Sequence, residues 1–367
     1  MRKKSFALLT VLAIAAALAG CSGKKQGAGE TQAQGAAEQG ETGKEAAEQV
    51  AAGDEASEAK ETEYTLKIAV GIPQSHKDIG NIMKEVIEKE TGGAVKVNVF
   101  ADNALGSDRE VLEAVQLGDI DITLSNMAPL AAAYSDLYLF DTMFLISNRD
   151  EAYKILDGEI GQSIAEGLKA KNLKTLSYPE NGFRNLTTND REVHTPEDVN
   201  GLKIRVMENE IQIAYWKALG ANPTPMAFGE VFTALQQKTI DGQENPVELI
   251  YDNKLNEVQK YMIMTQHIYN PLILAMNNEK FDAMPEEYQQ AIMKAAKEAT
   301  DYERKSAQDY EQDRIKKIEE DKTTEVIYLT DGERAQFKEA VKEVNSVVRE
   351  KMDHPELFDK AMEVVGD

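Results

Sequence analysis

Short runs in which apolar and polar residues alternate recur along the chain after residue 63. Runs at 64–70, 95–100 and 119–125 have the period-two spacing of half-buried strands. Between them, apolar residues recur three and four positions apart, which is the spacing of one buried helix face. Strands that alternate with helices in this way form βαβ units. The pattern therefore predicts an α/β protein built on a mostly parallel sheet.

Polar residues mark where the predicted helices begin. Ser75 is followed by Asp78 and Ser107 by Glu110, so both pairs have the three-residue spacing of a capping box. We therefore expect Ser75 and Ser107 to cap two helices. Much later, a charged stretch at 285 to about 320 carries a weak apolar stripe and predicts one long helix. By itself, this stripe is typical of a solvated or coiled-coil helix.

The segment 201–246 combines several of these signals. Apolar residues Leu202, Ile204 and Val206 share one face of a short strand, and Arg205 lies on the other face. The predicted elements of the segment are, in order, a strand at 201–206, a helix at about 209–219, a break at 222–225, a helix at about 227–237 and a turn leading into 243–246.

Polar residues directly follow two of the early strands. In open α/β sheets, ligands bind outside the carboxyl ends of the strands. This rule selects Gln74, Ser75 and His76 after the first strand, and Ser125 and Asn126 at the end of the third. His76 can equally be a surface or capping residue, and Ser125 and Asn126 an ordinary polar exit from a strand. The sequence leaves both interpretations open.

Two arginines in the second half are candidate anion-binding residues. Arg184 follows a strand at 173–178 and a predicted turn, whereas Arg205 lies within a strand. Most arginines are solvated surface residues, and taken alone both of these fit that description. A strand of a parallel sheet has both faces covered, however, so an arginine within it needs a partner. The planar guanidinium suits a carboxylate, to which it donates two parallel hydrogen bonds.

Length and charge narrow the range of partners. The chain has 367 residues, enough for two domains, with 41 Lys and Arg against 64 Asp and Glu and a net charge of -23. This charge argues against nucleic acid or an anionic membrane surface as a partner. It also repels anions at long range, so an anion site needs cations placed locally. The single cysteine, Cys21, excludes a disulfide framework and a cysteine-based metal cluster.

The first 21 residues have the features of a secretory signal. Arg2, Lys3 and Lys4 precede an apolar run at 6–19 that is too short to span a bilayer comfortably. The run ends in Leu-Ala-Gly-Cys21, which resembles a bacterial lipobox and predicts lipidation of the cysteine. The alternative is a plain secretory signal. The following segment, 22–62, is rich in Gly, Ala, Gln and Glu without aromatic residues, and predicts a disordered tether.

Three segments carry a resemblance to a known family. LKIRV, GANPTPMAFGEVFTALQ and DGQENP, all within 201–246, resemble the solute-binding proteins of tripartite ATP-independent periplasmic (TRAP) transporters, and the similarity extends over nearly everything after residue 63. The resemblance implies a two-lobed periplasmic-binding-protein-like α/β fold, with mixed sheets flanked by helices and a long helix spanning both lobes. On this basis the expected lobes are 63–180 with about 270–320 for lobe I, and 181–269 with about 321–367 for lobe II.

The resemblance also assigns expected roles to single residues. Arg205 would clamp the ligand carboxylate, Arg184 would be a second ligand arginine and Asn245 would contact the same ligand. Phe228 would line the site, and Glu230 would hold the arginine network in place.

One position departs from the family pattern. Where many relatives have Pro-Asn after the clamp strand, this chain has Met207 and Glu208. An acidic residue near a carboxylate site either points away from the ligand or accepts hydrogen bonds from sugar hydroxyls. The departure therefore makes a simple C4-dicarboxylate a less certain ligand.

The leading functional hypothesis is capture of an organic acid, either a sugar acid such as a uronate or a C4-dicarboxylate, and its delivery to a TRAP membrane permease. The chain would be a monomeric lipoprotein outside the cytoplasm, in the periplasm or on a Gram-positive surface, without cofactor or metal. One alternative is a cell-surface enzyme acting on acidic sugars, although the sequence has no His-Glu-x-x-His, Gly-x-Ser-x-Gly or Walker motif. The other alternative is a ligand sensor for a membrane kinase.

Overall fold

The structure is a computed structural model that describes residue 61 and residues 63–366. The predicted signal sequence, the lipidation site Cys21 and nearly all of the predicted tether lie outside the described residues. Among the described residues, no helix combines the length and the apolar character needed to cross a bilayer.

The described strands join into one ten-stranded sheet. They are β1 (Tyr64–Ala69), β2 (Val95–Phe100), β3 (Ile122–Asn126), β4 (Leu173–Ser177), β5 (Glu180–Thr188), β6 (Lys203–Val206), β7 (Asn222–Pro225), β8 (Gly242–Pro246), β9 (Tyr261–Asn277) and β10 (Glu325–Tyr328). Neighbouring strands follow the order β2-β1-β3-β9-β5-β8-β6-β7, and β4 and β10 also pair with β9.

The long strand β9 connects the two ends of this sheet. Its C-terminal part pairs antiparallel with β3 and β4, and its N-terminal part pairs antiparallel with β5 and parallel with β10. The other parallel pairs lie at the flanks, where β1 lies between β2 and β3, and β6 lies between β7 and β8. The sheet is therefore mixed, as the family resemblance implied, and less parallel than the alternating pattern alone predicts.

Helices cover the sheet. They are α1 (Gln74–Glu90), α2 (Asp108–Leu117), α3 (Arg149–Asp157), α4 (Glu159–Lys169), α5 (Glu210–Ala218), α6 (Val231–Gln236), α7 (Val247–Asp252), α8 (Asn278–Ala283), α9 (Glu286–Asp321), α10 (Asp331–Lys351) and α11 (Glu356–Val365). Short 3-10 turns are η1 (Ala128–Leu130), η2 (Ser135–Asp141), η3 (Pro196–Val199), η4 (Phe228–Glu230) and η5 (Leu255–Val258).

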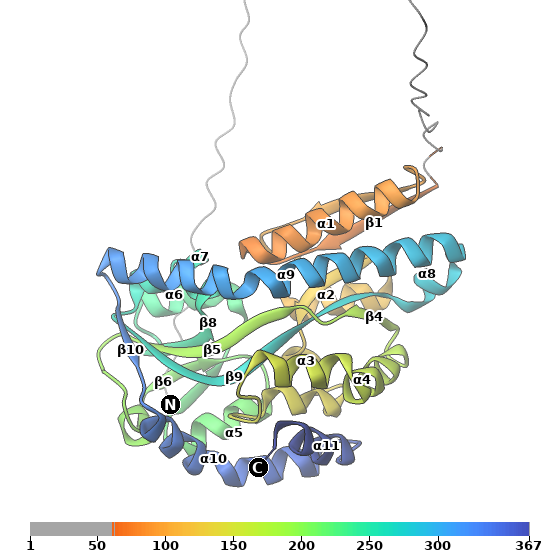
Figure 1. Cartoon of the computed structure of the whole chain (residues 1–367). Coiled ribbons are helices and arrows are strands. Elements are labelled where there is room, and N and C mark those ends of the chain that lie inside the picture. Colours follow the sequence, from red (N-terminus) through yellow and green to blue (C-terminus); the bar gives the residue numbers. More distant parts are fainter. Residues whose placement is uncertain (1–60, 62, 367) are drawn as a thin grey trace, which may run out of the picture. The chain divides into compact units, whose positions relative to one another are not determined.

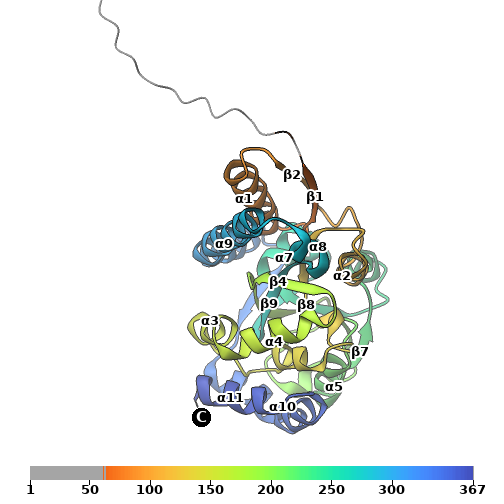
Figure 2. The same cartoon turned by 90° about the vertical axis from the view of Figure 1, so that its right-hand side faces the viewer.

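The 36-residue helix α9 packs on elements from both parts of the sheet. It lies beside α1 in both views and reaches α7 near its other end (Figures 1 and 2). Its Tyr310 hydroxyl donates to Asp78 of α1 at 2.6 Å, and Arg314 Nε donates to Asp252 of α7 at 2.8 Å. The predicted long helix is thus confirmed, and its weak apolar stripe is explained by packing on two separate surfaces.

The apolar core is divided in the same way. One cluster joins β1, β2, α1 and the N-terminal half of α9, where Ile292 and Ala296 are fully buried. Another joins α6, α7 and the start of β9, and contains Ile318 from the C-terminal half of α9. A third cluster extends from α2 and η2 through α3 and α4 to α5, α10 and α11. The single helix α9 therefore contributes to two cores.

Two stretches predicted to be irregular are strands. Asn222–Pro225 was expected to break the chain, but it forms β7 at the edge of the sheet, where its prolines need no partner for a missing N–H. The stretch 243–246 was expected to follow a turn, but it forms the fully buried strand β8. The segment 201–246 is therefore strand, helix, strand, helix, strand.

The helix cap predicted at Ser75 is wrong. Helix α1 begins at Gln74 after Pro73, without a side-chain cap. The Ser75 hydroxyl instead donates to Glu248 Oε2 at 2.8 Å, because this residue lies against α7. The capping box of Ser107 and Glu110 is confirmed at the start of α2.

Candidate ligand-binding site

A cavity of about 590 Å³ lies between the two flanks of the sheet. One wall comes from the β1–α1 loop, the start of α2 and the end of β3, and the opposite wall from β6, η4 and the end of β8. The two walls belong to segments far apart in the sequence, joined by the continuous sheet. This volume suits a small organic molecule.

Arg205 lies on the wall formed by β6. Its side chain is only 3% exposed, so it is not a solvated surface arginine. Its Nε and Nη2 both donate to the carbonyl oxygen of Met226, at 3.0 and 2.7 Å. Burial and the nearby Arg184 lower the pKa of Arg205 to about 10, which still leaves it protonated at neutral pH. These bonds use Nε and Nη2, and no described residue accepts a hydrogen bond from Nη1, which can therefore donate to a ligand.

The same wall contains three other residues that the sequence selected. The ring centroid of Phe228 lies 5.9 Å from the guanidinium carbon of Arg205, within the range of a cation–π attraction. Asn245 at the end of β8 and Glu230 in η4 also line the cavity. Glu230 is exposed, and the hydrogen bonds that hold Arg205 run to Met226, so the structure gives Glu230 no part in fixing that arginine.

Glu208 also lines the cavity, but its carboxylate faces a cation from the other wall. Its Oε1 lies 3.7 Å from Nη1 of Arg109 on α2. Both side chains are about half exposed, so this ion pair stands at a solvated part of the cavity. From the sequence, Glu208 was expected either to point away from the ligand or to accept hydrogen bonds from sugar hydroxyls. Neither interpretation anticipated a partner across the cavity.

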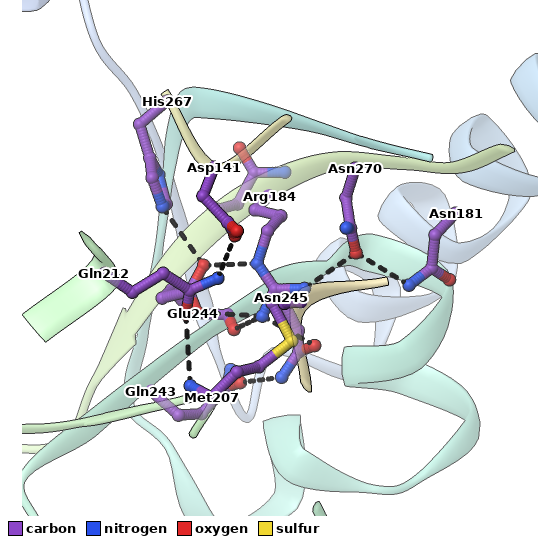
Figure 3. Close-up of polar contacts among 12 residues, drawn as sticks. Asp141, Asn181, Arg184, Met207, Gln212, Gln243, Glu244, Asn245, His267 and Asn270 are labelled. Atoms are coloured by element: carbon purple, nitrogen blue, oxygen red, sulfur yellow. Dashed lines mark hydrogen bonds and ion pairs between the residues drawn. The ribbon is translucent and has the colours of Figure 1, made fainter. Parts of the chain in front are cut away.

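Arg184 does not line the cavity. It is fully buried within β5 rather than after a turn, and it forms an ion pair with Glu244 (Figure 3). Its Nη2 also donates to Glu244 Oε1 at 2.8 Å and to Asn245 Oδ1 at 3.1 Å, and its Nη1 donates to Asn270 Oδ1 at 2.9 Å. In this structure Arg184 orients Asn245 from behind the wall.

Glu244 is the anion that balances Arg184. Burial by itself would raise the pKa of its carboxyl, but the charge of Arg184 and a hydrogen bond with His267 lower it to about 2. His267 Nε2 lies 3.1 Å from Glu244 Oε2, and burial lowers the pKa of this imidazole. Figure 3 shows His267 in contact with the Glu244 carboxylate, which in turn contacts the guanidinium of Arg184. The network fixes the strand that presents Asn245 to the cavity.

The opposite wall contains His76 and Asn126, as the strand-end rule predicted. His76 is buried, and burial lowers its pKa to about 4, so its ring is neutral at physiological pH. Its Nε2 lies 3.3 Å from Asn181 Oδ1, and its Nδ1 packs against Gly71, where a Cβ would lie only 2.4 Å away. Asn126 Nδ2 donates to Asn270 Oδ1 at 2.8 Å.

The three other residues selected by that rule, Gln74, Ser75 and Ser125, lie off the cavity wall. Gln74 turns its side chain to Asp78, with Nε2 2.8 Å from Oδ1, on the outer side of α1. Ser125 shares a 2.6 Å hydrogen bond with Thr123 within β3. The rule locates the correct loops, but it does not determine which side of each loop faces the ligand.

Sequence reasoning missed Asp108 and Arg109, which both line the cavity from the first turn of α2. The sequence did contain a signal for them, because Asp108 and Arg109 lie between the capping residues Ser107 and Glu110.

Burial raises the pKa of Asp108 to about 6, although the hydrogen bond from the Asn126 N–H and the charge of Arg205 act to lower it. Among the described residues, no group of three or more His, Cys, Asp or Glu side chains is arranged to hold a metal ion.

Comparison with known proteins places this cavity in a family context. The model of the bacterial extracellular solute-binding protein family 7 (DctP) matches residues 73–351. The 2,3-diketo-L-gulonate-binding periplasmic protein YiaO of Escherichia coli is 39% identical over 219 residues, which cover 60% of this chain and 67% of that protein.

Solved structures agree with this match. The sugar acid binding protein DctPAm from Advenella mimigardefordensis, in complex with galactonate, superposes with a TM-score of 0.80 at 31% identity, over 83% of this chain and 98% of that chain. A TRAP periplasmic solute-binding protein from Sulfurospirillum deleyianum with bound succinate gives a TM-score of 0.79 at 31% identity, over 83% and 100% of the two chains. The chain therefore belongs to family 7 of the bacterial extracellular solute-binding proteins, the family of the TRAP transporter solute-binding proteins.

Proposed function

We propose that this protein captures a small organic acid in the cavity, with the ligand carboxylate on Arg205, and delivers it to the membrane subunits of a TRAP transporter. The observation that carries the proposal is the state of Arg205. This cation is buried at the wall of a ligand-sized cavity and held by a backbone carbonyl, without a carboxylate of the protein as its ion-pair partner among the described residues. A buried cation of this kind gains from an anionic guest.

The relatives support the class of ligand. Similar proteins bind 2,3-diketo-L-gulonate, galactonate and succinate, which all carry a carboxylate. Two of these are sugar acids, and we propose a sugar acid as the ligand here. The comparisons give no support to the enzyme or to the sensor alternative, and we propose that the protein binds its ligand without converting it.

Binding would close the two lobes around the ligand. We propose that 63–180 with about 270–320 moves as one lobe, and 181–269 with about 321–367 as the other. The contacts of α9 with both α1 and α7 make this helix a candidate for the element that bends. Ligand closes the lobes only if it binds the closed form more tightly than the open one. We also propose that the protein works as a monomer, anchored outside the cytoplasm through a lipid on Cys21.

Calorimetric titration of the purified protein tests this proposal. We expect saturable binding of at least one acid from a panel of galactonate, glucuronate, 2,3-diketo-L-gulonate and succinate. Galactose, the matched neutral sugar, should give no saturable signal because it has no carboxylate for Arg205. The proposal fails if none of the acids binds, or if galactose binds as tightly as galactonate.

A further inference from the structure

The charges around the cavity are unevenly distributed. The ionisable residues along its walls, apart from the neutral His76, are two arginines and four carboxylic acids: Arg109, Arg205, Asp108, Glu110, Glu208 and Glu230. Arg109 already faces Glu208 at 3.7 Å. Of these two arginines, Arg205 is the one that has no carboxylate ion-pair partner within the part of the chain that the structure describes. A ligand with one carboxylate can be neutralised here, whereas a second carboxylate would meet acidic side chains.

The four acids are not equivalent. Glu208 is paired with Arg109, and Glu110 accepts from the Ser107 N–H and hydroxyl at 2.8 Å each, as part of the α2 cap. Glu230 is exposed to solvent. Asp108 is the exception, because it is partly buried and has no salt bridge among the described residues. Its Oδ1 accepts from the Asn126 N–H at 3.2 Å, and its carboxylate also accepts a hydrogen bond from the Ser125 hydroxyl. The two oxygens of a carboxylate have about four lone-pair sites, so the group can still accept from a further donor.

Asp108 and Arg205 occupy opposite walls of the same cavity. Each changes the pKa of the other, so their charges lie within electrostatic range. Within the described part of the chain, however, no ion pair joins them. A ligand that bridges the two walls can therefore present its carboxylate to Arg205 and the groups beyond it to Asp108. A partly buried carboxylate gains most from groups that donate hydrogen bonds, and the hydroxyls of a hydroxy acid are such donors.

We propose that Asp108 is the specificity-determining residue of this site, that it accepts hydrogen bonds from ligand hydroxyls, and that it restricts the ligand to hydroxylated monocarboxylic acids over plain dicarboxylates. This inference rests on the proposed function. Asp108 is selected by the geometry and the charge of the two cavity walls. The raised pKa of Asp108 agrees with a carboxylate whose hydration is incomplete.

The test compares galactonate with succinate as probes on three proteins. In the wild type we expect galactonate to bind more tightly than succinate. Asp108→Asn keeps the size of the side chain and the oxygen that accepts from Asn126, but loses the charge. It should weaken galactonate binding about tenfold or more, the scale of one hydrogen bond to a charged group. Succinate binding should stay unchanged or improve, because one repulsive charge is removed.

Asp119→Asn is the matched control, because it makes the same chemical change at an exposed residue just after α2 and outside the cavity wall. It should leave both affinities unchanged. Thermal unfolding of each variant shows whether the fold is retained. If Asp108→Asn does not fold, Asp108→Glu, which keeps the charge but moves it, should lower galactonate affinity more than succinate affinity.

The outcomes separate the two proposals. A wild type that binds none of the four acids of the calorimetric panel contradicts the proposed function. If only another acid of that panel binds, this acid replaces galactonate in the comparison. A wild type that binds both acids, with a variant that changes both affinities by the same factor, contradicts only the role of Asp108. A wild type that prefers succinate also overturns this inference, while leaving carboxylate capture by Arg205 intact.

Discussion

Arg205 is available to a ligand because its protein partner is a backbone carbonyl. The Met226 oxygen fixes the plane of the guanidinium through two donors without neutralising its charge. Arg184 lies on β5, next to β8, and differs from Arg205 because the carboxylate of Glu244 neutralises its charge inside the protein. These two buried arginines therefore have different chemistry, and the difference lies in which protein groups contact each of them.

Replacing Arg205 with lysine should remove most of the binding. Lysine keeps the positive charge but cannot hold the Met226 carbonyl and donate a planar pair of hydrogen bonds to a carboxylate. We expect Arg205→Lys to weaken acid binding about 10- to 100-fold in a calorimetric titration. The control is Lys203→Ala, an exposed position of the same strand, which should bind normally. Unchanged affinity in Arg205→Lys would remove this residue from the site.

Replacing Glu244 with glutamine should destabilise the fold. The change leaves Arg184 as a buried cation without its counter-charge, and breaking such a pair costs roughly 3–5 kcal/mol. Urea denaturation at neutral pH measures this loss of unfolding free energy. Glu257→Gln removes an exposed carboxylate 3.8 Å from Lys254 and should cost less than about 1 kcal/mol. Equal losses of unfolding free energy in the two variants would mean that the buried pair contributes no more to stability than the exposed one.

The same pair gives the protein a defined sensitivity to acid. The pKa of Glu244 is lowered from 4.5 to about 2 in the folded state, so its contribution to stability is complete above pH 4.5. It is lost as the pH falls from there towards 2, because the unfolded chain then binds the proton more readily. Wild-type unfolding free energy should therefore fall more steeply across this window than that of Glu244→Gln.

At the scale of elements, the start of α2 connects helix capping to the cavity wall. The Ser107 and Glu110 cap fixes the first turn, which carries Asp108 and Arg109 to the cavity wall. The sequence predicted this cap correctly from the spacing of two residues. It did not reveal that the residues inside the cap face a ligand, because that depends on where α2 packs.

Removing the cap should affect stability and binding together. Ser107→Ala should cost about 1 kcal/mol of unfolding free energy and weaken ligand binding by up to about fivefold, the equivalent factor. Thr330→Ala removes an equivalent capping box from α10, which does not line the cavity. It should lose similar stability with no change in affinity. If both variants bind normally, the order of the α2 first turn is irrelevant to recognition.

The errors at this scale have local causes. Ser75 has the spacing of a cap, but the tertiary contact with Glu248 uses its hydroxyl. The two prolines of β7 read as a break, because the sequence does not show that this strand lies at a sheet edge. Asn222–Pro225 becomes a strand by pairing with β6, and 243–246 by pairing with both β6 and β5. Periodicity is a local signal, and these elements depend on distant partners.

At the scale of the whole described structure, two elements bring the walls of the cavity together. Strand β9 pairs with β3 on one side and β5 on the other, and α9 packs on α1 and α7. Alternating strands and helices predicted an α/β fold, whereas the mixed sheet and the spanning helix were expected only from the family resemblance. Pairings over more than a hundred residues of sequence leave little trace in local spacing.

A ligand-bound crystal structure is the most direct test of this account. It should show both carboxylate oxygens or one of them about 2.7–2.9 Å from the guanidinium nitrogens of Arg205, the distance of a charge-assisted hydrogen bond. The rest of the ligand should reach the wall formed by α2. A carboxylate bound elsewhere, with Arg205 contacting only Met226, would contradict the central claim.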